Sequence, residues 1–321
     1  MTSKVLESAG QVAATSRLVQ IKHGAVARFC EELVSGGLRI PTWNDAYHFN
    51  DGTAETVTYL LVLDTLNACF WPAPGTIRWE IDYASERLSG YYGLAACLKR
   101  AFESGMPIRH ADALARLSPD DLREVFEGRG TLQLMEHRLD ALRELGRSLR
   151  SGYEGKAHRL VESARGSAAG LVELLAQGFS SFRDVATYQG RKVYFYKRAQ
   201  IFATDLHAAF GGKGWGRFED LDELTAFADY KLPQVLRHVG ILCYAEELTH
   251  KVDQKIPLES GSAEEVEIRA NTIWAVEMIR RELNGKGSSV KAFEVDWILW
   301  NLGQAGAFRK KPYHRTVTIF Y

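Results

Sequence analysis

The sequence predicts a mainly α-helical protein with a few short strands. Apolar residues recur at helical spacing over long stretches, most clearly in the leucines between Leu132 and Leu149. Ser118-Pro119-Asp120-Asp121 is a helix start, because it combines a hydroxyl cap, a first-turn proline and acids that favour the helix dipole. Alternating β-branched and aromatic residues occur only in short runs, such as Thr316 to Tyr321. Helices therefore account for most of the predicted structure.

The individual elements follow from the same signals in chain order. A helical pattern from Val12 to Val34 stops at Gly36-Gly37, and Ser262 with Glu265 forms a capping box before another helix. The expected helices cover residues 12–34, 54–67, 90–103, 118–127, 132–149, 160–175, 197–210, 222–228, 233–248, 266–283 and 290–302. The expected strands cover residues 76–82 and 316–321, with a strand or turn at 190–196.

The length of 321 residues suggests about two domains, at roughly 150 residues per domain. We place the boundary in the loop near Arg109 to Leu117, which gives an N-terminal helical lobe of residues 1–115 and a C-terminal lobe of residues 116–321. One compact helical domain is the alternative.

Composition restricts the class of partner and the compartment. Lys+Arg and Asp+Glu both number 40, so the chain lacks the basic excess that a polymeric nucleic-acid ligand requires. The four cysteines are scattered without zinc spacing, and we expect no metal site and no cofactor. No apolar run approaches the roughly 18 residues of a membrane span, and Met1 to Gln20 has no signal-peptide pattern. These features predict a cytoplasmic protein without a membrane partner.

Glycine-rich and phosphate-binding motifs add no further assignment. The chain contains no GxxxxGK[ST], and no GxGxxG in a strand–helix context. The stretch Gly211 to Gly216 is rich in glycine but follows a helical pattern, which predicts an ordinary loop.

The segment Leu224 to Tyr244 predicts a helix-hairpin-helix. One helix would end at Asp229-Tyr230, and a second would begin with Pro233 just inside it. Asp229 and Asp296 stand out because each lies among aromatic residues, which makes them candidates for a functional site. The alternative is that Asp229 caps a helix and Asp296 lies at the surface or in a salt bridge.

Several uncommon motifs are spread along the chain. The most specific is Phe227-Ala228-Asp229-Tyr230-Lys231-Leu232-Pro233-Gln234. The others are Asp64 to Asn67 with Phe70-Trp71, Ser89 to Tyr92, Phe182 to Asp184, Phe195 to Gln200, Glu265 to Arg269, Asp296 to Trp300 and His314 to Tyr321. With these motifs in preserved order, the chain resembles the queuosine-salvage family of queuosine 5′-phosphate N-glycosidases, and only the first 40 or so residues add little to the resemblance.

The resemblance implies a helical fold related to helix-hairpin-helix DNA glycosylases, with a central cleft for one nucleotide. It implies hydrolysis of queuosine 5′-monophosphate to queuine and ribose 5-phosphate. Such a reaction builds positive charge on the ribose, which a carboxylate beneath the anomeric carbon stabilises. The 7-deazapurine has no N7 to protonate, so the leaving base must be stabilised at other atoms. Two other classes stay open, a DNA or RNA base glycosylase and a non-catalytic queuine- or nucleotide-binding protein.

The family pattern assigns residues to the base and to catalysis. Around the base it places His48, Phe227, Asp229, Asp296 and Trp297, and the two aromatic rings would stack on the heterocycle. Five residues after Asp296 the family usually has an aspartate, whereas this chain has Asn301. Asp229 or Asp296 would then carry the negative charge, or Asn301 is an engineered substitution, or the register is wrong. If position 301 is the missing carboxylate, Asn301→Asp raises the hydrolysis rate.

The 5′-phosphate requires cations or helix N-termini. The candidates are Lys197 and Arg198 in the family's KRAQ segment, and His314 and Arg315 near the end of the sequence. Lys197 has a second possible role as a Schiff-base nucleophile, which simple hydrolysis of a nucleotide does not need.

Overall fold

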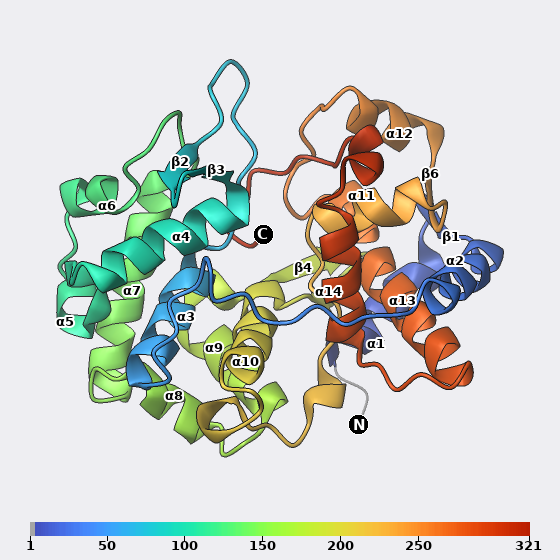
Figure 1. The fold of residues 1–321 in the computed structure, drawn as a ribbon. Helices are drawn as coiled ribbons and strands as arrows, with labels where there is room; N and C mark the ends of the chain where they lie inside the picture. Colours follow the sequence, from blue (N-terminus) through green and yellow to red (C-terminus); the bar gives the residue numbers. More distant parts are fainter. Residues whose placement is uncertain (1–3) are drawn as a thin grey trace.

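Helices form most of the chain and gather in two groups that extended segments join (Figure 1). The structure is a computed structural model and describes residues 4–321. The first group contains α3 (Ala54–Leu66), α4 (Gly90–Glu103), α5 (Ala111–Leu114), α6 (Pro119–Val125), α7 (Met135–Gly152), α8 (Ala157–Ser163), α9 (Ala168–Gly178) and α10 (Lys197–Ala209). The second contains α1 (Lys4–Thr15), α2 (His23–Ser35), α11 (Lys231–His238), α12 (Glu246–Asp253), α13 (Ala263–Gly285) and α14 (Ala292–Leu302).

Short elements complete the fold. The 3₁₀ turns are η1 (Pro107–Arg109), η2 (Ser180–Phe182), η3 (Gly214–Gly216), η4 (Leu221–Glu223) and η5 (Gly306–Lys310). The strands are β1 (Val19–Ile21), β2 (Glu80–Tyr83), β3 (Glu86–Ser89), β4 (Val185–Tyr188), β5 (Arg191–Tyr194) and β6 (Leu242–Tyr244). They form three antiparallel pairs, in which Val19 faces Tyr244, Glu80 faces Ser89, and Val185 faces Tyr194.

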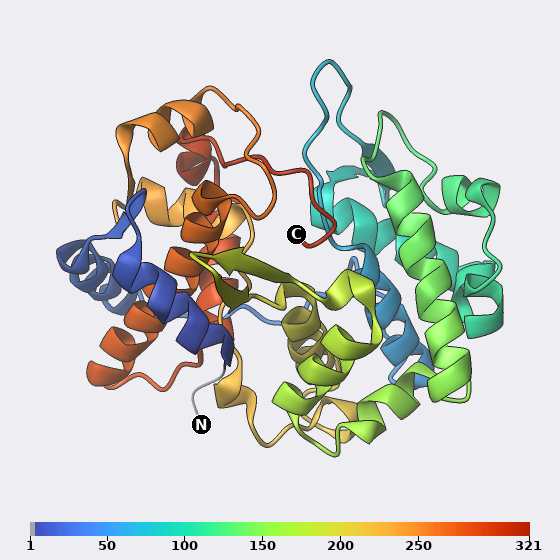
Figure 2. The same cartoon turned by 180° about the vertical axis from the view of Figure 1, so that it is seen from behind.

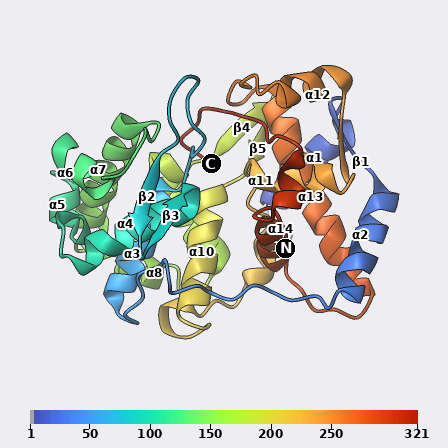
Figure 3. The same cartoon turned by 45° about the horizontal axis from the view of Figure 1, so that its top comes forward.

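Segments far apart in the sequence meet in the second group. Helix α1 packs against α13 and β5, and β1 pairs with β6, so the start of the chain lies against its C-terminal part (Figure 2). Helix α10 packs against α3 and α9 and lies on the side of the first group that faces the second (Figure 3). The extended chain between α2 and α3 crosses from one group to the other (Figure 1). One continuous hydrophobic core, from Val5 to Leu299, runs through both groups.

The mainly helical prediction is confirmed, and several helices lie where the sequence placed them. Ala54–Leu66, Gly90–Glu103 and Lys197–Ala209 differ from prediction by a residue at most. Helix α6 carries the expected cap, because the Ser118 side chain accepts from Asp121 N and the Asp121 carboxylate accepts from Ser118 N. Among residues 4–321, no helix combines the length and the apolar character that crossing a bilayer requires.

The single helix predicted over residues 12–34 is wrong, since α1, β1 and α2 occupy that stretch. The backbone amides of Leu18 and Val19 donate to the carboxylate of Glu267 at 2.7 and 3.1 Å, and β1 then pairs with β6. Tertiary partners therefore replace the helical hydrogen bonds there.

The first helix of the predicted hairpin, residues 222–228, is also wrong. After η4 the chain is irregular up to Tyr230, because side chains take its backbone amides. Thr225 N donates to Gln200 Oε1 at 2.8 Å, and Phe227 N donates to Asp296 Oδ2 at 2.7 Å. The helix predicted over residues 233–248 ends at His238, and Gly240 then turns with a φ of 75° into β6.

Three further predictions need correction. Residues 316–321 are extended but pair with no strand in the part of the chain described, although Cys69 N donates to Tyr321 O. The stretch 160–175 forms two helices, since Gly166 turns with a φ of 80°. The 76–82 strand starts only at Glu80.

Candidate active site

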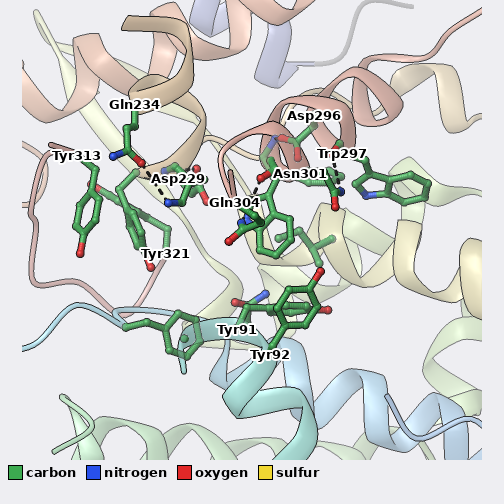
Figure 4. A pocket seen from close by; sticks show the side chains of 18 of the residues that line it. Tyr91, Tyr92, Asp229, Gln234, Asp296, Trp297, Asn301, Gln304, Tyr313 and Tyr321 are labelled. Carbon is green, nitrogen blue, oxygen red and sulfur yellow. Dashed lines mark hydrogen bonds between the residues drawn. The ribbon is translucent and has the colours of Figure 1, made fainter. Parts of the chain in front are cut away.

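A cavity of about 890 Å³ lies between the two groups of helices. Its walls come from residues 41–48, the start of α4, one face of α10, residues 227–234, α14 and the C-terminal segment. Figure 4 shows Tyr91 and Tyr92 facing Asp296 and Asn301 of α14 and Gln304 just after that helix, with Tyr313 and Tyr321 at one side. A cavity of this size is in the range of sites that hold small ligands.

Eight of the ten residues predicted from the sequence line this cavity. They are His48, Lys197, Phe227, Asp229, Asp296, Trp297, Asn301 and Arg315. Residues that are up to 267 positions apart in sequence, from His48 to Arg315, therefore contribute to one site. Arg198 and His314 do not reach it.

Asp229 caps a helix and also lines the cavity. Its Oδ1 accepts from the backbone amides of Lys231 and Leu232, at 2.7 and 2.9 Å, and so caps the first turn of α11. The helix-capping alternative is therefore correct, but only one carboxylate oxygen is used. Burial raises the pKa of Asp229, and the nearby ammonium of Lys197 opposes that rise.

Asp296 is buried, so the alternative of a surface residue is wrong. Its Oδ2 accepts from Phe227 N at 2.7 Å, which ties α14 to the irregular segment before α11. Burial and the charge of Asp229 raise the pKa of Asp296 well above its usual range. The shift favours the protonated form of this carboxyl, which is able to donate a hydrogen bond.

Asn301 lies one turn further along α14 and is exposed at the rim of the cavity. Its Nδ2 donates to the backbone oxygen of Trp297 at 2.9 Å. The aromatic wall lies deeper, where Phe227 is buried and the Trp297 ring packs against Phe293 at 5.1 Å between centroids. Asn301 is therefore closer to solvent than the buried Asp296 on the same helix.

Arg198 and His314 are unsuited to binding a phosphate in this cavity. The guanidinium of Arg198 is buried and donates to the backbone oxygens of Asp64, Thr65 and Ser181, which fixes the end of α3. Burial lowers the pKa of His314 to about 3, so this ring is neutral at physiological pH. The KRAQ motif gave no signal that its two neighbouring cations point in different directions.

Asp205 is the carboxylate that sequence reasoning missed. It follows Lys197 and Ile201 at intervals of four residues, so all three occupy one face of α10 and line the cavity. Its side chain is 5% exposed, and its Oδ2 has no hydrogen-bond partner in the part of the chain described. Burial and the neighbouring carboxyl of Asp64 raise the pKa of Asp205 well above its usual range. The spacing from Lys197 was the only signal in the sequence.

Three cations of the cavity wall lack carboxylate partners among the described residues. Arg78, Lys231 and Arg315 line the cavity, and none of them forms an ion pair with a carboxylate within residues 4–321. The guanidinium of Arg315 lies 5.5 Å from the Trp71 ring centroid, and its buried Nε has no partner among the described residues. Lys231 lies over Tyr313, with 5.8 Å from Nζ to the ring centroid. Uncompensated cations beside aromatic rings are suited to an anionic ligand group.

The fold and the site together define a helical protein with a cavity for a small ligand, in which buried acids and aromatic rings meet unpaired cations. The family model described as queuosine salvage protein matches residues 47–321. The chain belongs to this family. A queuosine 5′-phosphate N-glycosylase/hydrolase from Sphaerobacter thermophilus is 46% identical over 317 residues, which cover 99% of this chain and 97% of that protein.

Relatives with the same name occur in distant organisms. The protein from Dictyostelium discoideum is 36% identical over 330 residues, covering 99% of this chain and 98% of the relative. The protein from Mus musculus is 35% identical over 330 residues, covering 98% of both chains. The resemblance seen in the sequence motifs is thus confirmed over nearly the full length.

Proposed function

We propose that this protein hydrolyses the N-glycosidic bond of queuosine 5′-monophosphate and releases queuine and ribose 5-phosphate. The observation that carries the proposal is the composition of the cavity wall. Three buried carboxyls, those of Asp205, Asp229 and Asp296, share one cavity with unpaired cations. The names of the relatives supply the identity of the nucleotide.

The base end of the substrate would lie between α14 and the segment before α11. Phe227 and Trp297 offer ring faces to the heterocycle. Asp296, whose pKa is raised by burial and by the charge of Asp229, would in its protonated form donate a hydrogen bond to the leaving base as the bond electrons move onto it. Asp229 would accept a hydrogen bond from the base itself or from the secondary amine of queuine, which is cationic at neutral pH. The missing N7 is then replaced by contacts to other atoms of the base.

The carboxylate beneath the anomeric carbon is best supplied by Asp205. It lies on the cavity face of α10, and it has an oxygen without a partner. In its ionised form it would stabilise the positive ribose and accept a proton from the attacking water. Asn301 would have a lesser role, because it is exposed at the rim of the cavity and its amide nitrogen donates a hydrogen bond to the backbone oxygen of Trp297.

The phosphate would bind at the cations of Arg78, Lys231 and Arg315. None of them pairs with a carboxylate among the described residues, so their charge is open to a phosphate, although Lys231 Nζ also donates to Gln234 Oε1 at 3.1 Å. Lys197 lies among Asp229, Asp64 and Asp296, so its positive charge would stabilise these carboxylates more than it would stabilise a phosphate. Of the four phosphate ligands predicted from the sequence, Arg315 is the one retained in this proposal.

The fold relation, the type of ligand and the cellular compartment are also part of the proposal. A relation to helix-hairpin-helix glycosylases would have to rest on other parts of the fold, because the helix predicted before Asp229 is absent. A small nucleotide rather than a nucleic-acid polymer is favoured by the net charge of zero. Four cysteines without disulfides suit a reducing compartment such as the cytoplasm.

A turnover assay tests the proposal. Purified protein is incubated with queuosine 5′-monophosphate and, separately, with queuosine, and free queuine is measured by mass spectrometry. We expect release from the monophosphate and much slower release from the nucleoside. Binding of the monophosphate without any release would favour the nucleotide-binding alternative, and absence of both would refute the substrate assignment.

A further inference from the structure

Every exposed charged side chain in the cavity wall is a cation. Among the described residues, eight lysines and arginines line the cavity but three acids do, although the whole chain has 40 of each kind. The three acids are buried. The exposed charges of the wall are those of Arg78, Arg87, Lys255, Arg309 and Lys310. Because they are exposed, these cations lie where the cavity opens to solvent, and the opening is therefore positive.

Three of these cations, Lys255, Arg309 and Lys310, are called the outer cations below. They also lack a carboxylate partner within residues 4–321. The one side-chain contact printed by geometry for them is neutral, since the guanidinium of Arg309 donates to Gln304 Oε1 at 3.5 Å. Arg87 differs, because it pairs with two carboxylates of β2. The outer cations thus present their charge to solvent without compensation.

The outer cations lie beside the proposed phosphate ligands. The turn η5 carries two of them and packs against α11, which begins at Lys231. The third, Lys255, lies just before Leu258, whose backbone amide donates to the backbone oxygen of Arg315 at 2.7 Å. Burial and the like charge of Arg309 lower the pKa of Lys231. The outer cations and the proposed phosphate ligands therefore belong to one positive region of the wall.

Exposed charges act on a ligand mainly before it binds. A single exposed ion pair adds little to affinity, because both charges are well hydrated when they are apart. The summed field is different, since it extends about 10 Å at 0.1 M salt. A cleft lined by one sign of charge raises the association rate of an oppositely charged ligand by about 10- to 1000-fold. A phosphate monoester carries a charge of about −1.5 to −2 at pH 7, so such a field would attract it.

We propose that the outer cations attract the 5′-phosphorylated nucleotide to the cavity and speed its association, without bonding to it once it is bound. This role rests on the proposed function, which supplies the identity of the nucleotide. The phosphate would pass from the outer cations to Lys231 and Arg315, while the cationic amine of the base moves toward the buried acids. Queuosine has that amine but no phosphate, so the same field would not attract it. The outer cations thus favour the phosphorylated substrate through its rate of association.

Binding rates test this role without bond cleavage. The probe is the carbocyclic analogue of queuosine 5′-monophosphate, in which a CH₂ group replaces the ring oxygen. It cannot form the oxocarbenium ion, so its bond to the base stays intact. Surface plasmon resonance on the full chain, held on an uncharged matrix, gives the association and dissociation rates. The outer cations are removed together by Lys255→Gln, Arg309→Gln and Lys310→Gln.

The matched control removes three exposed cations that do not line the cavity, by Arg28→Gln, Lys192→Gln and Lys213→Gln, so both variants have the same net charge. At about 20 mM salt, loss of the outer cations should lower the association rate about 5- to 20-fold, with dissociation changed less than about twofold. The control should associate within about twofold of the wild type. At about 300 mM salt the two variants should become alike, because salt screens the field.

The same analogue without its phosphate separates attraction from damage to the fold. It is a cation, so loss of the outer cations should not slow its association, and normal binding of it shows that the variant is folded. Equal association of the phosphorylated analogue with the two variants at low salt would overturn the role of the outer cations. A loss that falls mainly on dissociation would overturn it too, because the outer cations would then bond to the bound phosphate.

Failure of the proposed hydrolysis has a different signature. If the wild type binds the phosphorylated analogue but releases no queuine from the natural nucleotide, hydrolysis is refuted and the attraction of the nucleotide stands. If the wild type does not bind the phosphorylated analogue, both the substrate assignment and the role of the outer cations are refuted.

Discussion

Single side chains give the cavity wall both acidic and cationic groups, and Asp205 is the most informative of them. We expect Asp205→Asn to lower kcat by about 100-fold or more, because the amide cannot supply the negative charge that the cationic ribose requires. Binding of queuosine 5′-monophosphate, measured by calorimetry, should change little. Asn301→Asp is the matched comparison: a large rise in kcat in that variant, with normal turnover by Asp205→Asn, would return the catalytic role to position 301.

Arg315 tests the cationic groups of the wall. Arg315→Gln should raise KM for queuosine 5′-monophosphate about tenfold or more, because a charge-assisted hydrogen bond contributes roughly 1.5–3 kcal/mol. The rate with the nucleoside queuosine should stay nearly the same, since that substrate has no phosphate. Arg159→Gln, which removes an exposed arginine paired with Glu162, is the control. Equal loss with nucleotide and nucleoside would mean that Arg315 supports the wall instead of the phosphate.

A buried ion pair between Arg269 and Asp184 links α13 to the start of α10, a helix that lines the cavity. Arg269 donates to both oxygens of Asp184, at 2.9 and 2.6 Å, and to the backbone oxygen of Ala228 at 3.0 Å. The Asp184 carboxylate in turn accepts from Lys197 N at 3.3 Å, and Tyr196 precedes the helix with a φ of 47°. One arginine thus holds together the strained start of α10 and the segment that carries Asp229.

Arg269→Met should therefore be strongly destabilising. Removing one partner of a buried pair leaves the other charge unpaired, which costs about 3–5 kcal/mol of unfolding free energy. Arg159→Gln, at an exposed pair, should cost about 1 kcal/mol or less. Urea denaturation of both variants measures the difference. Similar unfolding midpoints would show that the Arg269 network contributes little to stability.

The sequence predicted those elements whose own residues determine them. Helix α3 is apolar along its length, and the capping box of α6 uses only Ser118 and Asp121, so both were placed correctly. The segments that failed are those whose backbone amides bond to distant side chains, as Leu18 does to Glu267 and Phe227 to Asp296. Local patterns contain no information about such partners.

The candidate site follows the same division. The family motifs led to Asp229, Asp296 and Trp297, which do line the cavity. Asp205 was missed because an acid in the middle of a helix is normally a solvated residue, and only the packing of α10, on the side of the first group that faces the second, turns its face inward. Arg198 was assigned to the phosphate because sequence alone does not reveal that backbone oxygens already occupy its guanidinium.

The molecule as a whole should be more stable near pH 6 than near pH 8. Burial raises the pKa of Asp64 to about 7, and it raises the pKa values of Asp205 and Asp296 well above their usual range. A raised carboxyl pKa contributes stability at low pH, and that contribution is lost as pH rises through the folded-state value. The opposite effect comes from His314, whose pKa is lowered to about 3, so its stabilisation is lost as pH falls below about 6.5.

Urea unfolding at the two pH values measures this difference. Asp64→Asn should reduce it, because the variant lacks the group that titrates between them. A wild type that is equally stable at pH 6 and pH 8, or a difference that Asp64→Asn leaves intact, would argue that these carboxyls relax into contact with water.

The chain contains seven tryptophans. Trp43, Trp297 and Trp300 line the cavity, and the guanidinium of Arg315 lies over the ring of Trp71. Indole emission depends on the polarity around the ring, so a nucleotide that displaces water from this cavity should change the fluorescence of the unmodified protein. The fluorescence of these tryptophans should therefore report whether the cavity holds a ligand. Ligand entry and product departure become measurable in a stopped-flow instrument, separately from bond cleavage and without a label on either molecule.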